Sequence, residues 1–198
     1  MKRRAVFLDR DGTINVDVGY PDRYDRIRIF PCAFEAVRKL NAAGLAVVVV
    51  TNQSGIGRGY LTEADLSDIH RRLESDFKAA GARLDGIYHC PHFKGSADPA
   101  WDADCDCRKP LPGLARRAAA DLGLELEGSY MVGDKVEDIR FGLSFGGSPV
   151  LVLTGYGEAS RDALRREGVV PAHVAPDLGA AADWILDRER EDGPTGRL

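Results

Sequence analysis

Hydrophobic and polar positions along the chain follow two alternating periods. Continuous apolar runs of four to six residues have the length and composition of strands that are buried on both faces of a sheet. These predicted strands lie at 5–8, 45–50, 129–132 and 150–153, with shorter ones at 87–88 and around Val174. Between them, apolar residues recur every three or four positions, as on one face of a helix. The predicted helices lie at 33–43, 62–80, 112–122, 136–145 and 177–191, with a further helix after 153.

The alternation of strand and helix predicts an α/β fold built on a doubly wound, Rossmann-like parallel sheet. The helix at 62–80 should begin with a capping box, with Thr62 as the N-cap and Asp65 three residues later. A length of 198 residues suits a single domain, which we place at 1–190, followed by a frayed tail at 191–198. The long irregular stretch at 15–31 is either functional or an element that the pattern misses.

Charge and cysteine content narrow the class of protein. A formal net charge of −4 indicates neither nucleic acid nor an anionic membrane as a partner. Asp9 interrupts the first apolar run and no stretch has membrane-spanning length, so we expect neither a signal peptide nor a membrane span. The expectation is a cytoplasmic protein, a monomer, whose four cysteines form no disulfides.

Two carboxylates follow the first predicted strand directly. Asp9 and Asp11 are spaced i, i+2, which places them on one face of an extended chain. Carboxylates that close repel each other unless a cation or a shared proton lies between them. At the carboxyl end of a strand in an α/β sheet, this pattern indicates a magnesium-assisted active site. The alternative is a strand followed by an acidic turn.

Other polar residues lie at or near the ends of further predicted strands. Thr51 and Asn52 follow the second long strand, Asp134 follows the strand at 129–132, and Lys109 precedes a helix. Each has a simpler interpretation: Thr51 as a helix N-cap, Lys109 as a solvated charge, Asp134 as a turn residue. A parallel sheet nevertheless brings its strand ends to one edge, so the carboxylates, a hydroxyl and an ammonium are expected to converge.

The segment before Lys109 has a second pattern, of cysteine and histidine. Cys90, His92, Cys105 and Cys107 make a closed set of four soft ligands, of the kind that selects zinc. Because all four fall in one predicted loop, the metal would be structural and would hold the residues that follow. A redox pair or buried inert thiols are the alternatives. Cys32 is most simply a buried thiol.

The motif Asp9-Arg10-Asp11-Gly12-Thr13 resembles the first motif of the haloacid dehalogenase superfamily of phosphatases. Thr51, Lys109 and Gly133-Asp134 with Asp138 resemble its second, third and fourth motifs, in the same order. The resemblance implies that fold, with a zinc-binding loop and no large cap domain. It also implies that Asp9 is the nucleophile and Asp11 the general acid and base, while Thr51 and Lys109 stabilise charge on the phosphoryl group.

The same resemblance implies ligands for metal and substrate. Magnesium would be held by Asp9, Asp134 and the backbone carbonyl of Asp11, and Asp138 would orient Lys135 or the shell around the metal. The implied substrate contacts are Asp17, Gly19, Tyr20, Asn52, Gln53, Ser54, Arg108 and Lys135.

The run Cys105-Asp106-Cys107-Arg108-Lys109-Pro110 is similar to that of the zinc-containing branch of the superfamily, which acts on heptose bisphosphates and on histidinol phosphate. The long gap between His92 and Cys105, and the expected absence of a fused dehydratase domain, favour the heptose substrate. The implied function is magnesium-dependent removal of the C7 phosphate of D-glycero-D-manno-heptose 1,7-bisphosphate through an aspartyl-phosphate, which gives heptose 1-phosphate. The alternatives are histidinol phosphate or another small phosphomonoester as substrate, or a catalytically silent binding module.

Overall fold

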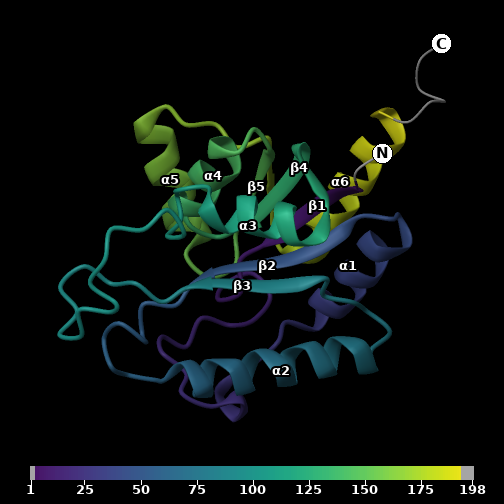
Figure 1. Cartoon of the computed structure of the whole chain (residues 1–198). Coiled ribbons are helices and arrows are strands. Elements are labelled where there is room, and N and C mark those ends of the chain that lie inside the picture. The colour runs from purple at the N-terminus through teal and green to yellow at the C-terminus, as the bar shows by residue number, and fades with distance from the viewer. Residues whose placement is uncertain (1–2, 193–198) are drawn as a thin grey trace.

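The computed structural model describes residues 3–192 and is built on a six-stranded sheet, shown in Figure 1, whose paired strands all run parallel. The order of strands is β3-β2-β1-β4-β5-β6. The strands are β1 (Arg3–Leu8), β2 (Ala46–Asn52), β3 (Gly86–Cys90), β4 (Leu124–Gly133), β5 (Ser148–Val152) and β6 (His173–Ala175). This confirms the predicted α/β class and the parallel sheet.

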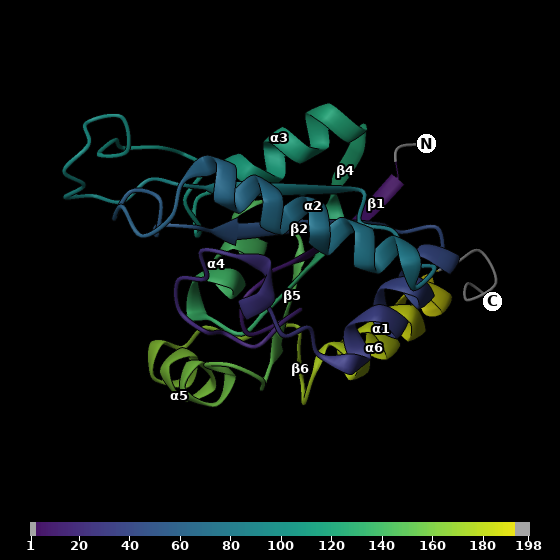
Figure 2. The same ribbon diagram turned by 90° about the horizontal axis from the view of Figure 1, so that it is seen from below.

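Helices cover both faces of this sheet. They are α1 (Pro31–Ala42), α2 (Glu63–Ala79), α3 (Gly113–Leu122), α4 (Val136–Ser144), α5 (Gly157–Glu167) and α6 (Leu178–Asp192). Figures 1 and 2 show α3, α4 and α5 on one side of the strands, and α1 and α2 on the other. Helices α1 and α6 lie side by side.

The core forms because the strands are apolar on both faces. Along β2, Val47 and Val49 pack with α1, α2 and α6, while Ala46, Val48 and Val50 pack with α3 and α4. Alternation of side chains along an extended chain sends successive residues to opposite faces. The unbroken valine run is therefore the pattern that a central parallel strand needs.

Element boundaries depart from the predicted ones by a few residues. Strand β4 begins at Leu124, five residues before the predicted start, and β2 continues through Thr51 and Asn52. The capping box of α2 is confirmed, because Thr62 accepts from the Asp65 backbone and Asp65 accepts from the Thr62 backbone. Helix α6 extends to Asp192, past the predicted boundary at 190, and the rest of the predicted tail, 193–198, lies outside the described residues.

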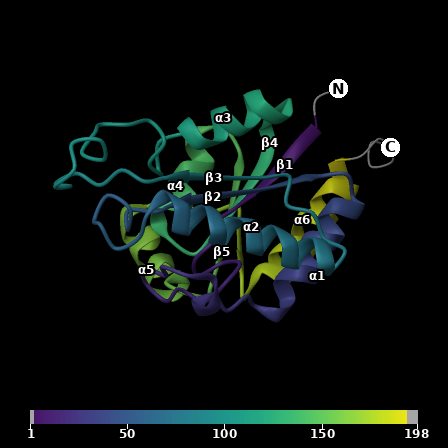
Figure 3. The same ribbon diagram turned by 60° about the horizontal axis from the view of Figure 1, so that its bottom comes forward.

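The order of strands decides where a site can form. The chain moves outward from β1 to β2 and β3, then returns to add β4 on the other side of β1. Neighbouring connections leave the sheet in opposite directions at this switch point, which opens a crevice at the carboxyl ends of β1 and β4. Figure 3 shows the loops that surround this edge, including the long segment between β3 and α3. Within residues 3–192, the longest helices are too polar or too short to cross a bilayer.

Candidate active site

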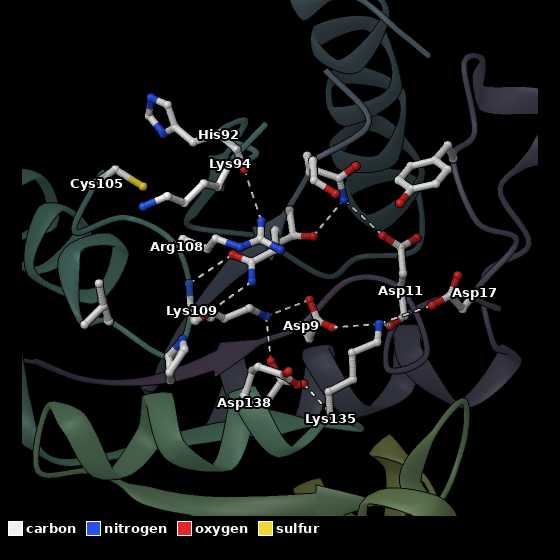
Figure 4. Close-up of a pocket in the computed structure, with 18 of the residues that line it drawn as sticks. Asp9, Asp11, Asp17, His92, Lys94, Cys105, Arg108, Lys109, Lys135 and Asp138 are labelled. Atoms are coloured by element: carbon white, nitrogen blue, oxygen red, sulfur yellow. Dashed lines mark hydrogen bonds and ion pairs between the residues drawn. The ribbon is translucent and has the colours of Figure 1, made fainter. Parts of the chain in front are cut away.

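A cavity of about 770 Å³ lies at the carboxyl edge of the sheet. Figure 4 shows side chains from the ends of β1 and β2, the start of α4 and the loop before α3 that point toward one another around it. The site residues predicted from the sequence that line this cavity are Asp9, Asp11, Asp17, Gly19, Tyr20, Thr51, Asn52, Gln53, Ser54, His92, Cys105, Arg108, Lys109 and Lys135.

Lys109 is held at the centre of the site by two carboxylates. Its ammonium lies 2.8 Å from Asp9 Oδ1 and 2.6 Å from Asp138 Oδ1, and it also donates to the Val50 carbonyl. Burial acts to lower the pKa of Lys109, but the charges of Asp138 and Asp9 outweigh it and raise that pKa. The ammonium therefore stays charged beside the carboxylate of Asp9. A solvated surface lysine, the simpler interpretation, is excluded because Lys109 is 3% exposed.

Asp138 meets more of the site than the sequence predicts. It is expected to orient Lys135 or the shell around a metal, and the structure adds that one carboxylate oxygen pairs with Lys109. The other accepts from the backbone N–H of Lys135 at 3.0 Å and so caps the start of α4. Asp138 therefore fixes Lys109, and it orients only the backbone of Lys135. The motif spacing alone does not show which lysine it meets.

Asp134 contributes a buried oxygen that lacks a protein donor. Its Oδ2 accepts from the backbone N–H of Tyr156 at 2.8 Å, while its Oδ1 has no hydrogen-bond partner among the described residues. Oxygen atoms of Asp9, Asp134 and Asp138 lie within 4.8 Å of one another. Burial, together with the negative charge of Asp9, raises the pKa of Asp134 to about 7. This accumulation of negative charge is what a bound cation relieves.

Gly12 allows the first motif to approach Asp134 closely. Its backbone has a φ of +91°, and a Cβ at this position would lie 2.2 Å from Asp134 Oδ2. Any side chain would therefore collide with a buried carboxylate and would also occupy a backbone region that L-residues rarely adopt. The loop after β1 reaches the end of β4 only because this residue is glycine.

Lys135 carries a second ammonium among the acidic groups. Its Nζ lies 3.1 Å from Asp17 Oδ2 and 3.4 Å from the backbone oxygen of Asp11. Asp9 Oδ2 and Asp134 Oδ1 are each 4.0 Å away. Although burial opposes it, the surrounding negative charge, that of Asp9 above all, raises the pKa of Lys135. Figure 4 shows Lys135 extended from α4 toward Asp17, on the opposite side of Asp9 from Lys109.

Asp11 is held by donors that the sequence did not indicate. Arg10 donates to its Oδ2 through two nitrogens, Gln53 donates to the same oxygen, and Asn15 donates to Oδ1. Burial acts to raise the pKa of Asp11, but the charge of Arg10 and these hydrogen bonds lower it overall. Arg10 lies inside the first motif, so its position is a signal in the sequence, whereas Asn15 lies in the irregular stretch at 15–31.

The polar end of β2 is tied to the rest of the site. Thr51 Oγ1 accepts from Gln53 at 2.8 Å, and the Asn52 side chain both donates to and accepts from the Lys109 backbone. Thr51 lies within β2 and is 1% exposed, so it is not the helix N-cap of the simpler interpretation. The two bonds between Asn52 and the Lys109 backbone connect the second motif to the third along one side of the cavity.

The four zinc-ligand candidates come together beside the cavity. Donor atoms of Cys90, His92, Cys105 and Cys107 lie within 4.8 Å of one another, and the Cys90 and Cys105 sulfurs are 3.6 Å apart. All the cysteines are free thiols. Hydrogen bonding to Cys90, then burial, raises the pKa of the Cys107 thiol. Cys32 lies apart from this cluster and is half-buried rather than fully buried as predicted.

The cluster sits directly behind two cationic side chains of the cavity wall. Arg108 follows Cys107 and donates to the His92 carbonyl at 3.2 Å. Lys94, two residues after His92, lines the same wall, as Figure 4 shows. The sequence did not indicate Lys94 or Tyr156, because neither belongs to a motif and only the folded loops bring them to the cavity.

Comparison with known proteins gives consistent matches. A family model described as HAD-hydrolase-like matches residues 106–181. The D-glycero-beta-D-manno-heptose-1,7-bisphosphate 7-phosphatase of Yersinia pestis is 40% identical over 92% of this chain and 89% of its own. That of Escherichia coli K12 is also 40% identical, over 92% and 88%. The crystal structure of D,D-heptose 1,7-bisphosphate phosphatase from B. bronchiseptica, complexed with magnesium and phosphate, has a TM-score of 0.81 and 34% identity, covering 93% of this chain and 99% of that chain.

Proposed function

The chain belongs to the haloacid dehalogenase superfamily and, within it, to the family of the heptose 1,7-bisphosphate 7-phosphatases, and from this membership we propose its reaction. The enzyme removes the C7 phosphate of D-glycero-β-D-manno-heptose 1,7-bisphosphate and leaves the C1 phosphate in place. The observation that carries this proposal is the convergence of Asp9, Asp11, Lys109 and Asp134 at the switch point of the sheet. Relatives that share 40% identity over nearly their whole length support the choice of substrate.

The proposed chemistry begins at Asp9. Its carboxylate attacks the C7 phosphorus, and the bond from phosphorus to the sugar oxygen breaks, which leaves an aspartyl-phosphate. Lys109, 2.8 Å from Asp9, and the Thr51 hydroxyl stabilise the negative charge that develops on the phosphoryl oxygens. Asp11 gives a proton to the leaving sugar oxygen and then takes one from the water that hydrolyses the intermediate.

The residues fit a magnesium ion. Asp134 Oδ1 is a buried carboxylate oxygen without a protein donor, close to Asp9, and hard oxygen ligands are what magnesium prefers. Asp9, Asp134 and the Asp11 backbone carbonyl would hold the ion, while Asp138 is already engaged by Lys109. When bound, magnesium supplies positive charge that offsets the repulsion between the phosphate and these carboxylates.

The cysteine and histidine cluster fits a structural zinc. Three sulfurs and one imidazole form a closed ligand set with no position left for a substrate. Zinc there would fix the loop from β3 to α3, and with it the positions of Arg108 and Lys109. The free thiols also support a reducing, cytoplasmic location, and we propose a monomer with one catalytic domain over residues 1–190.

Arg108 is the proposed partner of the phosphate that does not react. Its guanidinium is planar and forked, which suits a phosphate, and it lines the cavity on the side of the zinc loop. Asp17, Gly19, Tyr20, Asn52, Gln53, Ser54 and Lys135 line the rest of the cavity and are proposed to contact the sugar and the reacting phosphate.

A phosphate-release assay on a panel of substrates tests this function. The panel holds both anomers of the heptose bisphosphate, heptose 7-phosphate and histidinol phosphate. We expect the β-bisphosphate to have the highest kcat/KM. Arg108→Ala should lower kcat/KM for the bisphosphate about 10–100-fold, which is the effect of losing a charge-assisted contact of about 1.5–3 kcal/mol. The same variant should have nearly the wild-type kcat/KM for the monophosphate, which has no second phosphate to lose.

Arg140→Ala is the matched control, because Arg140 pairs with Glu167 on the surface and lies outside the cavity. It should leave both substrates unaffected. A higher kcat/KM for histidinol phosphate than for either bisphosphate would contradict the proposed substrate. Equal losses on the bisphosphate and the monophosphate in Arg108→Ala would show that Arg108 serves the reacting phosphate instead.

A further inference from the structure

Arg10 is a buried charge that the proposed chemistry does not use. It is 0% exposed and is the largest of the fully buried side chains among the described residues. A buried guanidinium costs free energy unless its donors are paired, so its partners show what keeps it there. Those partners lie on two sides: Asp11 at the cavity and His70 on α2.

The fork of Arg10 saturates one oxygen of Asp11. Nε and Nη2 lie 3.1 and 2.9 Å from Asp11 Oδ2, and Gln53 Nε2 donates to the same oxygen at 3.0 Å. Among the residues that the structure describes, Oδ1 has a single donor, Asn15, at 2.9 Å. A carboxylate oxygen has two lone pairs, so Oδ2 is fully occupied while Oδ1 keeps one free. Oδ1 is therefore the atom available to hold and transfer a proton.

His70 holds the far end of Arg10. Its Nε2 lies 3.2 Å from Arg10 Nη1, and only an unprotonated nitrogen accepts this bond. Burial, then the charge of Arg10, lowers the pKa of His70 to about 2, so the ring is neutral. His89 packs against it with ring centroids 5.7 Å apart and is held in turn by Glu63 at 3.0 Å. These contacts fix the guanidinium from the side away from the cavity.

We propose that Arg10 is a positioning residue for Asp11, aligned by neutral His70, and that it makes Oδ1 the proton-transfer atom. This inference rests on the role proposed for Asp11. Oδ1 gives its proton to the sugar oxygen as the bond from phosphorus to that oxygen breaks. It then takes a proton from water as the water oxygen bonds to phosphorus and the bond to Asp9 breaks.

The test compares variants that keep or lose the aligning contact. His70→Gln places an amide oxygen near the position of Nε2 and keeps an acceptor, whereas His70→Leu removes it. Arg10→Lys keeps the charge but loses the fork. His173→Gln is the control, because His173 stacks on Trp184 at β6 and α6, outside the cavity.

Each variant is assayed by rapid mixing with heptose 7-phosphate and with p-nitrophenyl phosphate. Misplacing a catalytic group by about 1 Å costs on the order of 100-fold, so His70→Leu and Arg10→Lys should lower kcat on the sugar phosphate about 10–100-fold with KM nearly unchanged. On p-nitrophenyl phosphate their first turnover should keep the wild-type rate, because nitrophenolate leaves without a proton. Later turnovers should be slower, because hydrolysis of the aspartyl-phosphate still needs Asp11 to take a proton from water. The fast first turnover followed by slower ones gives a burst of nitrophenolate. His70→Gln should restore kcat to within about threefold.

Equal losses in the first turnover of both substrates would overturn the proposal, because a merely structural defect slows both. Wild-type kinetics in His70→Leu would overturn it as well. If the Arg10 variant does not fold, the two His70 variants still decide the question. Asp11→Asn separates the role of Asp11 from the role of Arg10. If this variant shows no burst with p-nitrophenyl phosphate, the acid and base role proposed for Asp11 is wrong. If it shows a burst, that role stands, and the other variants test only whether Arg10 positions Asp11.

Discussion

At the scale of single residues, the site is a balance of buried and half-buried charges. Five carboxylates, those of Asp9, Asp11, Asp17, Asp134 and Asp138, face the three cations of Arg10, Lys109 and Lys135. With every group ionised, this leaves two negative charges, the amount that one divalent ion neutralises. Asp134 Oδ1, which has no hydrogen-bond partner among the described residues, is an oxygen that such an ion would contact. A dianionic phosphate would meet repulsion here without such an ion.

One residue links the site to the pH dependence of stability. His70 has a pKa of about 2 in the folded protein, below its ordinary value of 6.5, so below pH 6.5 the unfolded chain binds a proton that the folded chain does not. The free energy of unfolding therefore has its full value above pH 6.5 and decreases as the pH falls below 6.5, where protonation of His70 favours the unfolded chain. Between pH 7 and pH 5 we expect the free energy of unfolding to fall by about 1–2 kcal/mol more in wild type than in His70→Gln.

Urea unfolding followed by circular dichroism at both pH values measures this difference. His173→Gln serves as the control and should keep the wild-type dependence. Parallel pH dependence in wild type and His70→Gln would show that His70 takes up a proton in the folded state, and would remove the neutral acceptor that Arg10 requires.

The residues that could be predicted from sequence are those whose position depends on strand ends. Asp9, Thr51 and Asp134 are set by the strands that precede them, and the structure brings them together. The contact between Arg10 and His70 could not be predicted, because the two lie sixty residues apart and meet only when α2 packs over the sheet. The pairing of Asp138 with Lys109 could not be predicted for the same reason, because side-chain direction at the start of a helix is decided by packing.

At the scale of elements, the loop between β3 and α3 has the largest effect on the site. It contains three of the four proposed zinc ligands, the fourth being Cys90 at the end of β3, and it ends with Arg108 and Lys109. Much of this segment is exposed, and a segment of that kind relies on a metal to fix its shape. The motif spacing predicted the ligand set, but not that Lys94 would reach the cavity from the same loop.

Removing one ligand tests this role of the loop. Purified protein should contain one zinc per chain, and Cys107→Ser should lose it, because structural zinc binding is coupled to folding. Activity should fall at least about tenfold, since Arg108 and Lys109 lose their positions. Elemental analysis by mass spectrometry and a magnesium-supplemented assay measure both effects.

Cys32→Ser is the matched control, because Cys32 lies on α1 away from the cluster. It should keep both zinc and activity. Wild-type protein prepared without chelator that contains no zinc would contradict the structural role of the metal, whatever the activity of the variants.

At the scale of the whole molecule, the site lies where the strand order of the sheet reverses, between β1 and β4. The alternation of periods predicted the parallel sheet, because continuous apolar runs suit strands that are buried on both faces. It did not predict the extra length of β4, whose first residues alternate leucine with exposed glutamate and so lack a continuous apolar run. The site is assembled from the ends of β1, β2 and β4, from the loops that follow them and from the loop between β3 and α3, so only the topology makes it continuous.

In the proposed reaction, Asp9 receives the C7 phosphoryl group while the C1 phosphate stays on the sugar. A single-turnover reaction with the β-bisphosphate, quenched in acid, tests it most directly, with peptides mapped by mass spectrometry and the sugar identified by phosphorus NMR. We predict a transient phosphoryl group on the peptide that contains Asp9, absent in Asp9→Asn, and heptose 1-phosphate as the product. A phosphoryl group on another residue, no phosphoenzyme at any time point, or heptose 7-phosphate as the product would rule this reaction out.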